Sequence, residues 1–278
     1  MKKIVLCPNM SRDEGLEVTR KVRDMLTQAG CQVVLSPIYG EVTDLPTQAL
    51  SQALEGADLL VSLGGDGTIL HLAPLMKESS VPLVGVNLGH KGFLTELDRD
   101  SVEKLLDAAA GRYEIVPRMM LDVELIRDGE CIFADTAINE ALVSGIVQNV
   151  RLTALGDGER ILTFSGDGVI ISSPTGSTAY SMSAGGPIVE PGADNIILTP
   201  ICAHNLQPRS LIASPNRRVE IQVGRVNHRN AFLSVDGGRA MRVYGGDRIL
   251  LEMGNQKTKL LKLKDTTFFD IVKSKLNH

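Results

Sequence analysis

The chain has 278 residues, which suggests two domains at about 150 residues each. Its 29 basic and 33 acidic residues give a net charge of −4, and aromatic residues make up only 4% of the chain, with no tryptophan. Nucleic-acid-binding proteins usually carry a basic excess and stacking aromatic residues, so this composition disfavours that class. Glycine, by contrast, is over-represented, with 27 residues.

The sequence lacks the features of a secreted or membrane protein. The apolar run at the N-terminus is too short for a signal peptide, and no stretch reaches the roughly 18 apolar residues of a membrane span. The four cysteines form no CxxC pair, which disfavours a zinc ribbon or a thioredoxin-like site. We therefore expect a cytoplasmic protein that binds neither nucleic acid nor membrane.

The first 110 residues predict alternating strands and helices. Short apolar runs predict strands at 4–7, 32–35, 59–63 and 83–86, and segments with helical spacing predict helices at 16–29, 47–54, 68–77 and 100–110. Ser11 precedes Glu14 by three residues, so a capping box should open the first helix. This alternation is typical of an α/β domain with a parallel sheet and right-handed crossovers.

After Gly111 the pattern changes to apolar–polar alternation. Asp128-Gly129 and Gly156-Asp157-Gly158 predict hairpin turns. Further strands are predicted at 121–125, 151–155, 160–164, 169–171, 219–223, 231–235, 249–252 and 260–263, with one helix at 178–184. Residues 111–259 therefore predict a β-rich, mostly antiparallel domain, and residues 267–276 return to helical or mixed character.

The sharpest local motif is Gly64-Gly65-Asp66-Gly67-Thr68, between a predicted strand and a predicted helix. Its glycines let the backbone approach a ligand closely, and free amides at a helix start suit phosphate groups. A carboxylate in such a loop repels phosphate unless Asp66 has a role, such as accepting a proton or holding a metal ion. The alternative is a tight turn with Asp66 as a cap.

A second segment, residues 173–186, is rich in hydroxyl groups and glycine. It reads Ser173-Pro174-Thr175-Gly176-Ser177-Thr178-Ala179-Tyr180, followed by Ser181, Ser183, Gly185 and Gly186. Such a strand-to-helix turn can form a donor-rich cradle for a polar ligand. The alternative is a turn capped by hydroxyl groups. It accounts well for one or two of the five hydroxyls of residues 173–180 but poorly for all five.

Two smaller motifs are candidates for ligand contacts. Asn139-Glu140 could fix a sugar through an amide and a carboxylate, or could be a solvated strand end. Asp167, between Gly166 and Gly168, could face a ligand or could belong to a hairpin turn. The five histidines have no metal-ligand spacing, and the Walker, GxGxxG, HExxH and GxSxG motifs are missing, so we expect no metal site built from protein side chains.

Together these segments resemble the NAD kinase family. The block from Pro174 to Tyr180 is highly specific for that family, whereas the GGDG loop is shared with diacylglycerol and sphingosine kinases and with phosphofructokinases. The order and spacing agree over roughly residues 59–240. The matching segments are 64–68, 85–89, 92–95, 139–140, 167–168, 174–187, 199–202 with His204, and 235–237.

The resemblance implies transfer of the ATP γ-phosphoryl group to the 2′-hydroxyl of the adenosine ribose of NAD, giving NADP. Asp66 would accept the hydroxyl proton, and Gly64, Gly65, Gly67 and Thr68 would form the loop beside the nucleotides. Asn139 and Glu140 would hold a ribose, and Asp167 would face the nicotinamide end. The remaining contacts, around an adenine on which Tyr180 could stack, would come from Thr175, Thr178, Ala179, Tyr180 and Ser183.

The resemblance also implies an architecture. An α/β domain of residues 1–110 would carry the GGDGT loop, a β-rich dinucleotide-binding domain would span 111–259, and the tail 260–278 would return to the first domain. The substrates would lie in a long cleft between the domains. Because the GGDGT loop contains no Lys or Arg, Mg²⁺ carried by ATP should supply most of the countercharge. A homodimer or homotetramer is expected.

Two other functions stay open on the sequence. A lipid kinase could share the GGDG loop but would give no role to residues 175–180. A non-catalytic NADP(H) sensor could keep the fold but would gain nothing from Asp66 near a phosphate. The choice between NAD and NADH, to which Ser165 could contribute, stays open too, as do polyphosphate as donor and feedback by NADP(H).

Overall fold

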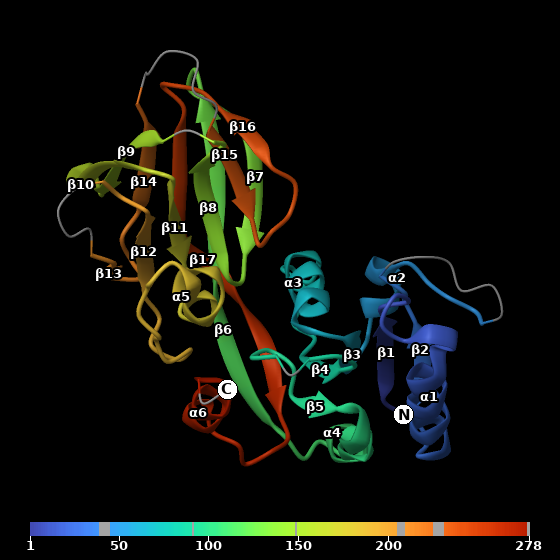
Figure 1. Cartoon of the computed structure of the whole chain (residues 1–278). Helices are drawn as coiled ribbons and strands as arrows, with labels where there is room; N and C mark the ends of the chain where they lie inside the picture. Colours follow the sequence, from blue (N-terminus) through green and yellow to red (C-terminus); the bar gives the residue numbers. More distant parts are fainter. Residues whose placement is uncertain (39–44, 91, 148, 205–208, 225–230, 277–278) are drawn as a thin grey trace. The chain divides into compact units, whose positions relative to one another are not determined.

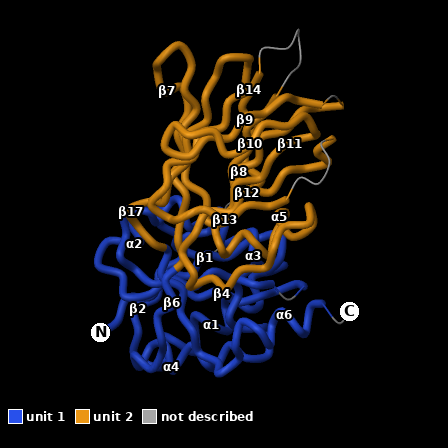
Figure 2. Tube along the Cα trace, turned by 90° about the vertical axis from the view of Figure 1, so that its left-hand side faces the viewer, with its two compact units in different colours: residues 1–117, 258–278 blue, residues 118–257 orange. Residues whose placement is uncertain are grey.

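The computed structural model describes residues 1–38, 45–90, 92–147, 149–204, 209–224 and 231–276 (Figure 1). The chain divides into two compact units, one of residues 1–117 with 258–278 and one of residues 118–257 (Figure 2). The first unit holds a parallel sheet and the second holds antiparallel strands. The predicted fold class, an α/β part followed by a β-rich part, is therefore confirmed.

The parallel sheet of the first unit consists of the four predicted strands. Its order is β4 (Leu83–Asn87), β3 (Leu59–Gly64), β1 (Lys3–Pro8) and β2 (Gln32–Leu35). The short strand β5 (Leu97–Asp98) pairs with β4. The strand order reverses between β1 and β3, because the chain continues from β1 to its neighbour β2 on one side and then crosses over to β3 on the other side of β1. Such a switch point is where open α/β sheets bind ligands.

Helices cover both faces of this sheet. Alternate strand residues such as Leu6, Val61 and Val86 form one buried core with α1 (Glu17–Gln28) and α4 (Leu105–Ala109). Gly85 instead faces Ile69 of α3 (Asp66–Leu75), because successive side chains along a strand point to opposite faces. This arrangement is the one that parallel crossovers produce.

The start of α1 differs from the prediction. Ser11 and Glu14 do not form the expected capping box. The buried carboxylate of Asp13 accepts hydrogen bonds from the backbone N–H groups of Val18 and Thr19, at 3.1 and 2.9 Å. The neighbouring acidic side chain therefore satisfies the free amides of the helix start in place of the serine.

The remaining short helices begin or end differently from their predicted ranges. Residues 100–110 form a 3₁₀ segment, η2 (Arg99–Lys104), before α4. Residues 175–183 form a 3₁₀ turn, η3 (Thr175–Thr178), and a short helix, α5 (Tyr180–Ser183). Another 3₁₀ turn, η1, spans Glu14–Leu16, and α2 spans only Leu50–Leu54. Such 3₁₀ turns are common at the ends of helices and as connectors.

Two antiparallel arrays form the second unit. One is a six-stranded sheet in the order β13 (Leu211–Ala213), β12 (Ile196–Ile201), β11 (Gly168–Ser172), β8 (Glu140–Gly145), β15 (Ala231–Val235) and β16 (Met241–Val243). The other runs β10 (Glu159–Gly166), β9 (Val150–Gly156), β14 (Val219–Val223), β17 (Arg248–Lys262), β6 (Glu114–Arg127) and β7 (Glu130–Ala137). One apolar core takes residues from both, among them Val143 and Ile171 from the first and Leu152 and Ile221 from the second.

Both predicted hairpins of the second unit are confirmed. Asp128 and Gly129 join β6 to β7 with positive φ angles of 52° and 87°, and Asp157 and Gly158 join β9 to β10 with 52° and 84°. Two central residues with positive φ match the right-handed twist of a hairpin, which explains the Asp-Gly pairs.

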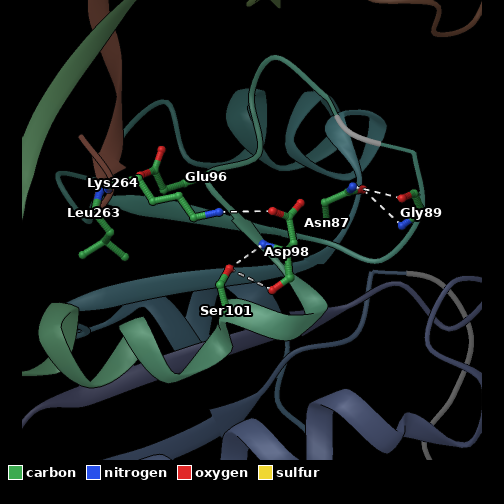
Figure 3. Close-up of polar contacts among 7 residues, drawn as sticks. All are labelled: Asn87, Gly89, Glu96, Asp98, Ser101, Leu263 and Lys264. Atoms are coloured by element: carbon green, nitrogen blue, oxygen red, sulfur yellow. Dashed lines mark hydrogen bonds and ion pairs between the residues drawn. The ribbon is translucent and has the colours of Figure 1, made fainter. Parts of the chain in front are cut away.

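The C-terminal part of the chain returns to the first unit, as predicted (Figure 3). Residues 249–252 and 260–263 were expected to be separate strands, but β17 is one continuous strand whose end pairs with β4 through Leu260 and Leu83. Its middle residues 255–257 are exposed, so their polar character does not mark a loop. Beyond β17, the backbone N–H groups of Leu263 and Lys264 donate to Glu96 Oε1 at 2.7 and 2.6 Å.

The last helix, α6 (Phe268–Leu276), confirms the helical prediction for the tail. None of the helices in the described ranges has the length and apolar character that crossing a membrane requires.

The cap of α1 gives a stability prediction. Replacing Asp13 with Ala leaves buried amides at the helix start without an acceptor and should lower the free energy of unfolding by about 1–2 kcal/mol. Urea unfolding of Asp13→Ala measures this loss. Ser11→Ala is the matched control, because its exposed hydroxyl bonds only to Asn9 Oδ1. An equal loss in both variants would contradict this assignment of the cap.

Candidate active site

The GGDGT loop lies at the carboxyl ends of the parallel strands. It follows β3 and opens α3, beside the ends of β1 and β4. A pocket with a volume of about 370 Å³ forms there, at the switch point of the sheet. Its lining residues are Asn9, Arg12, Gly64, Gly65, Asp66, Gly67, Thr68, Asn87, Gly89 and His90. All five predicted residues of the loop are therefore gathered in one pocket.

Thr68 ties this loop together. Its hydroxyl accepts hydrogen bonds from the Gly65 N–H at 3.3 Å and from the Asn9 side-chain amide at 3.2 Å. Gly64 makes this possible, because a Cβ there would lie 2.2 Å from Thr68 Oγ1. The Thr68 hydroxyl therefore holds the loop closed against the end of β1.

The Asp66 side chain reaches away from its own helix. Its carboxylate accepts three backbone hydrogen bonds, from the N–H groups of Phe93, Leu94 and Thr95, at 2.6, 3.1 and 3.1 Å. No side-chain capping bond joins Asp66 to the start of α3. The alternative interpretation of Asp66 as a simple turn cap is therefore wrong, and the carboxylate instead orients the segment after β4.

Arg12 supplies the positive charge that the loop itself lacks. It comes from the turn after β1, and its side chain is exposed in the lining of the pocket together with His90. A guanidinium group recognises phosphate oxygens through paired donors. Arg12 and Asn9 were not predicted as site residues, and Asn87 was included only in the matching segment 85–89. The available signal was that Asn9 directly follows β1 and that Asn87 ends β4.

In the second unit, Asn139 and Glu140 lie at the start of β8 and are held by a carboxylate. Asp236 accepts hydrogen bonds from the N–H groups of Ile138, Asn139 and Glu140, at 2.7, 2.9 and 2.9 Å. Asp236 was predicted only as part of the matching segment 235–237. Its structural role could have been suspected from the Asp-Gly pair after a strand, which also occurs in ordinary turns.

Glu140 and Asp236 both have raised pKa values. Burial, and secondarily the charge of Asp236, raise the pKa of Glu140 from 4.5 to about 7. Burial also raises the pKa of Asp236 from 3.8 to about 6, against the lowering effect of its three amide donors. Glu140 Oε2 is buried without a hydrogen-bond partner. A partly protonated carboxyl group near neutral pH can both donate to and accept from a ligand hydroxyl.

Most hydroxyls of the 173–183 segment make internal hydrogen bonds. Ser173 Oγ donates to the Ile138 carbonyl at 2.5 Å, and Thr178 Oγ1 donates to the Thr175 carbonyl at 3.1 Å. Similar internal bonds engage Ser177 with the backbone of Val189, and Ser181 with Thr199. The hydroxyls therefore fold the turn, which the hydroxyl-cradle interpretation did not anticipate.

Gly176 packs this turn against the Asn139 backbone. A Cβ on Gly176 would lie 2.1 Å from the Asn139 carbonyl oxygen. Thr175 and Thr178 are buried beside it, and Thr175 Oγ1 has no hydrogen-bond partner. After this turn, Tyr180 and Ser183 of α5 are exposed and Ala179 is half-buried. The turn and the Asn139-Glu140 pair thus form one continuous group in the second unit.

Asp167 lies apart from that group. Strand β11 runs from Gly168 to Ser172, with Asp167 before its first residue and the 173–183 turn after its last. In the register, Gly168 pairs with Ser144 whereas Ser172 pairs with Glu140. Asp167 is exposed, and its hydrogen bond to Cys202 raises the pKa of that thiol. The structure therefore places Asp167 at the opposite end of β11 from Asn139 and Glu140.

Comparisons with known proteins agree along the whole chain. Residues 4–113 match the family model of the ATP-NAD kinase N-terminal domain, and residues 116–263 match that of the ATP-NAD kinase C-terminal domain. The chain belongs to the NAD kinase family. The lipid-kinase alternative loses its support, because both halves match NAD kinase models and not the GGDG loop alone.

Individual relatives of the NAD kinase family match over nearly their full length. A protein named NAD kinase from Ruminiclostridium cellulolyticum is 36% identical over 281 residues, covering 99% of this chain and 98% of its own. The structure of yeast NADH kinase complexed with NADH has a TM-score of 0.82 at 25% identity, covering 98% of this chain and 86% of the yeast chain. An NAD kinase from Archaeoglobus fulgidus in complex with ATP shares the fold, with a TM-score of 0.77 at 23% identity and coverage of 99% and 98%.

The raised pKa of Glu140 predicts how stability changes with pH. Between its unfolded value near 4.5 and its folded value near 7, the folded chain binds the proton more tightly, so the free energy of unfolding falls as pH rises. Glu140→Gln, which stays neutral, should remove up to about 3 kcal/mol of this fall, since one pKa unit corresponds to about 1.4 kcal/mol. Urea unfolding at a series of pH values measures the effect.

The residual pH dependence and a control variant complete this experiment. Asp236 keeps its own raised pKa in the variant, so part of the pH slope should survive. Glu130→Gln, which removes an exposed carboxylate from the β6–β7 hairpin, is the control and should leave the slope unchanged. Parallel pH profiles for the wild type and Glu140→Gln would show that Glu140 has no raised pKa.

Proposed function

We propose that the protein transfers the γ-phosphoryl group of ATP to the 2′-hydroxyl of the adenosine ribose of NAD, giving NADP, as its family membership implies. The observation that carries the proposal is the pocket at the switch point, where one carboxylate, one guanidinium and the amides of a glycine loop surround a single space. Positioning and neutralisation of charge are what phosphoryl transfer mainly requires from a protein.

In this proposal Asp66 orients the acceptor hydroxyl and takes its proton late in the reaction. A carboxylate offers about four lone-pair sites, and three are used by backbone amides. One site therefore remains for the 2′-hydroxyl. A weakly basic acceptor is sufficient when the proton leaves late, because little charge develops on the attacking oxygen early in a loose transition state.

The phosphates of ATP would lie against the glycine loop and Arg12. Gly65 and Gly67 leave the backbone accessible, and the start of α3 presents free amides to anionic groups. Mg²⁺ would arrive with ATP, held largely by the phosphate oxygens, and would neutralise charge on the transferring group. Arg12 would add a fixed positive charge that stays when the metal-bound product leaves.

The second unit would bind the dinucleotide. Asn139 and Glu140 would hold a ribose, and the turn at Thr175 and Thr178 would border the adenine with Ala179, Tyr180 and Ser183. Asp167, at the far end of β11 from this pair, would contact the nicotinamide end of the dinucleotide. The homodimer or homotetramer stays a prediction. The cytoplasmic location stays a prediction.

The direct test is NADP formation by the purified protein. With ATP, Mg²⁺ and NAD, we expect NADP to accumulate in proportion to enzyme, detected with an NADP-specific dehydrogenase. No product at high enzyme concentration, together with measurable binding of NADP(H), would favour the non-catalytic sensor instead. Phosphorylation of a diacylglycerol as fast as NAD would contradict the assignment of the acceptor.

Asp66→Asn tests the role of the carboxylate. Loss of the proton acceptor should lower kcat by about 100-fold or more, while the dissociation constant for NAD stays within several-fold of the wild-type value. Steady-state kinetics and calorimetric titration with NAD measure the two effects. Asp100→Asn, which changes an exposed carboxylate in η2, is the control. Near-normal kcat in Asp66→Asn would remove Asp66 from the catalytic role.

A further inference from the structure

The segment Gly92–Thr95 encloses the Asp66 carboxylate on one side. Three successive amides, of residues 93, 94 and 95, point at its two oxygens, with Phe93 N bonding to Oδ2 and the other two to Oδ1. Hydrogen bonds to a charged acceptor are stronger than neutral ones and hold it in one orientation. Both carboxylate oxygens are thereby fixed by this short segment.

Gly92, the residue before these amides, is in contact with the same carboxylate. A Cβ on Gly92 would lie 1.8 Å from Asp66 Oδ1, 2.2 Å from Cγ and 2.4 Å from Oδ2. Real Cβ atoms do not approach other heavy atoms this closely, so any side chain at position 92 would displace Asp66. The requirement is space for the carboxylate.

The other end of the segment is anchored to the sheet and to the C-terminal tail. The Glu96 N–H donates to the Gly85 carbonyl at 3.0 Å, and Glu96 Oε1 accepts from two tail amides. Near the start of the segment, beside Gly92, Lys275 Nζ of α6 lies 4.4 Å from the centre of the Phe93 ring, within the range of a cation–π contact. The segment therefore has little room to yield when Gly92 gains a side chain.

We propose that Gly92 is a positioning residue for the phosphoryl transfer: its missing side chain lets three backbone amides seat Asp66 in the orientation that meets the acceptor hydroxyl. This inference rests on the proposed function. It assigns Gly92 no contact with substrate. A displacement of about 1 Å in a reacting group can lower the rate about 100-fold.

Gly92→Ala tests the proposal. We expect kcat for NADP formation to fall by about 100-fold, with the dissociation constant for NAD within about threefold of wild type. Gly192→Ala is the matched control, because nothing lies within 4 Å of a Cβ at that position and its φ is not positive. A kcat for Gly92→Ala within threefold of the control would overturn the proposal. So would an equal loss of NAD binding and of kcat, since that is the result of general damage.

A thermal unfolding cycle tests the contact without any turnover. In the wild-type background Gly92→Ala should lower Tm, and in the Asp66→Gly background, where the clashing carboxylate is gone, it should lower Tm little or not at all. If Gly92→Ala alone is too unstable to assay, the double variant should recover a folded yield. Equal losses in both backgrounds would overturn the proposal. If the wild type makes no NADP, the proposed function fails, and this cycle still reports on the contact.

Discussion

The structure around the candidate active site depends on one interaction, the bonding of the Asp66 carboxylate by three successive backbone amides. A carboxylate near phosphates is costly unless its charge is compensated, and amide dipoles compensate it without adding a second titrating group. The carboxylate is therefore held in one orientation and left with one free acceptor site. Gly92 provides its space, β4 anchors the amides, and the returning tail supports that anchor through Glu96.

The second unit also contains a carboxylate that accepts hydrogen bonds from three successive backbone amides. There Asp236 gathers the amides of residues 138–140, and the functional candidates Asn139 and Glu140 are carried by those amides. In the first unit the amides of residues 93–95 orient the candidate catalytic carboxylate of Asp66. In the second unit the carboxylate of Asp236 instead orients the backbone that carries Asn139 and Glu140. Both groupings join segments far apart in the sequence, 27–29 residues in one case and 96–98 in the other. Long-range amide–carboxylate bonds thus place the candidate residues in each unit.

Local patterns in the sequence were enough for the four strands of the parallel sheet, the two hairpin turns and the GGDGT loop, because these depend on apolar runs and turn residues that lie close together along the chain. Strands β8 and β12 of the second unit were not predicted. The Asp13 cap, the continuous β17 and the lining residue Arg12 were not predicted. The cap required a choice between Ser11 and the neighbouring Asp13. The continuity of β17 and the position of Arg12 in the pocket depend on strands that the sheet brings together. The hydroxyls of the 173–183 segment were read as ligand donors for the same reason: their internal acceptors, such as the Ile138 carbonyl, are remote in sequence.

Hydrogen exchange at the amides of Phe93, Leu94 and Thr95 tests most directly whether the Asp66 carboxylate holds this segment. These amides should exchange slowly in the wild type and become fast in Asp66→Gly, while the amides of residues 138–140, held by Asp236, keep their rates. Fast exchange in the wild type, or slow exchange that survives loss of the carboxylate, would contradict the account.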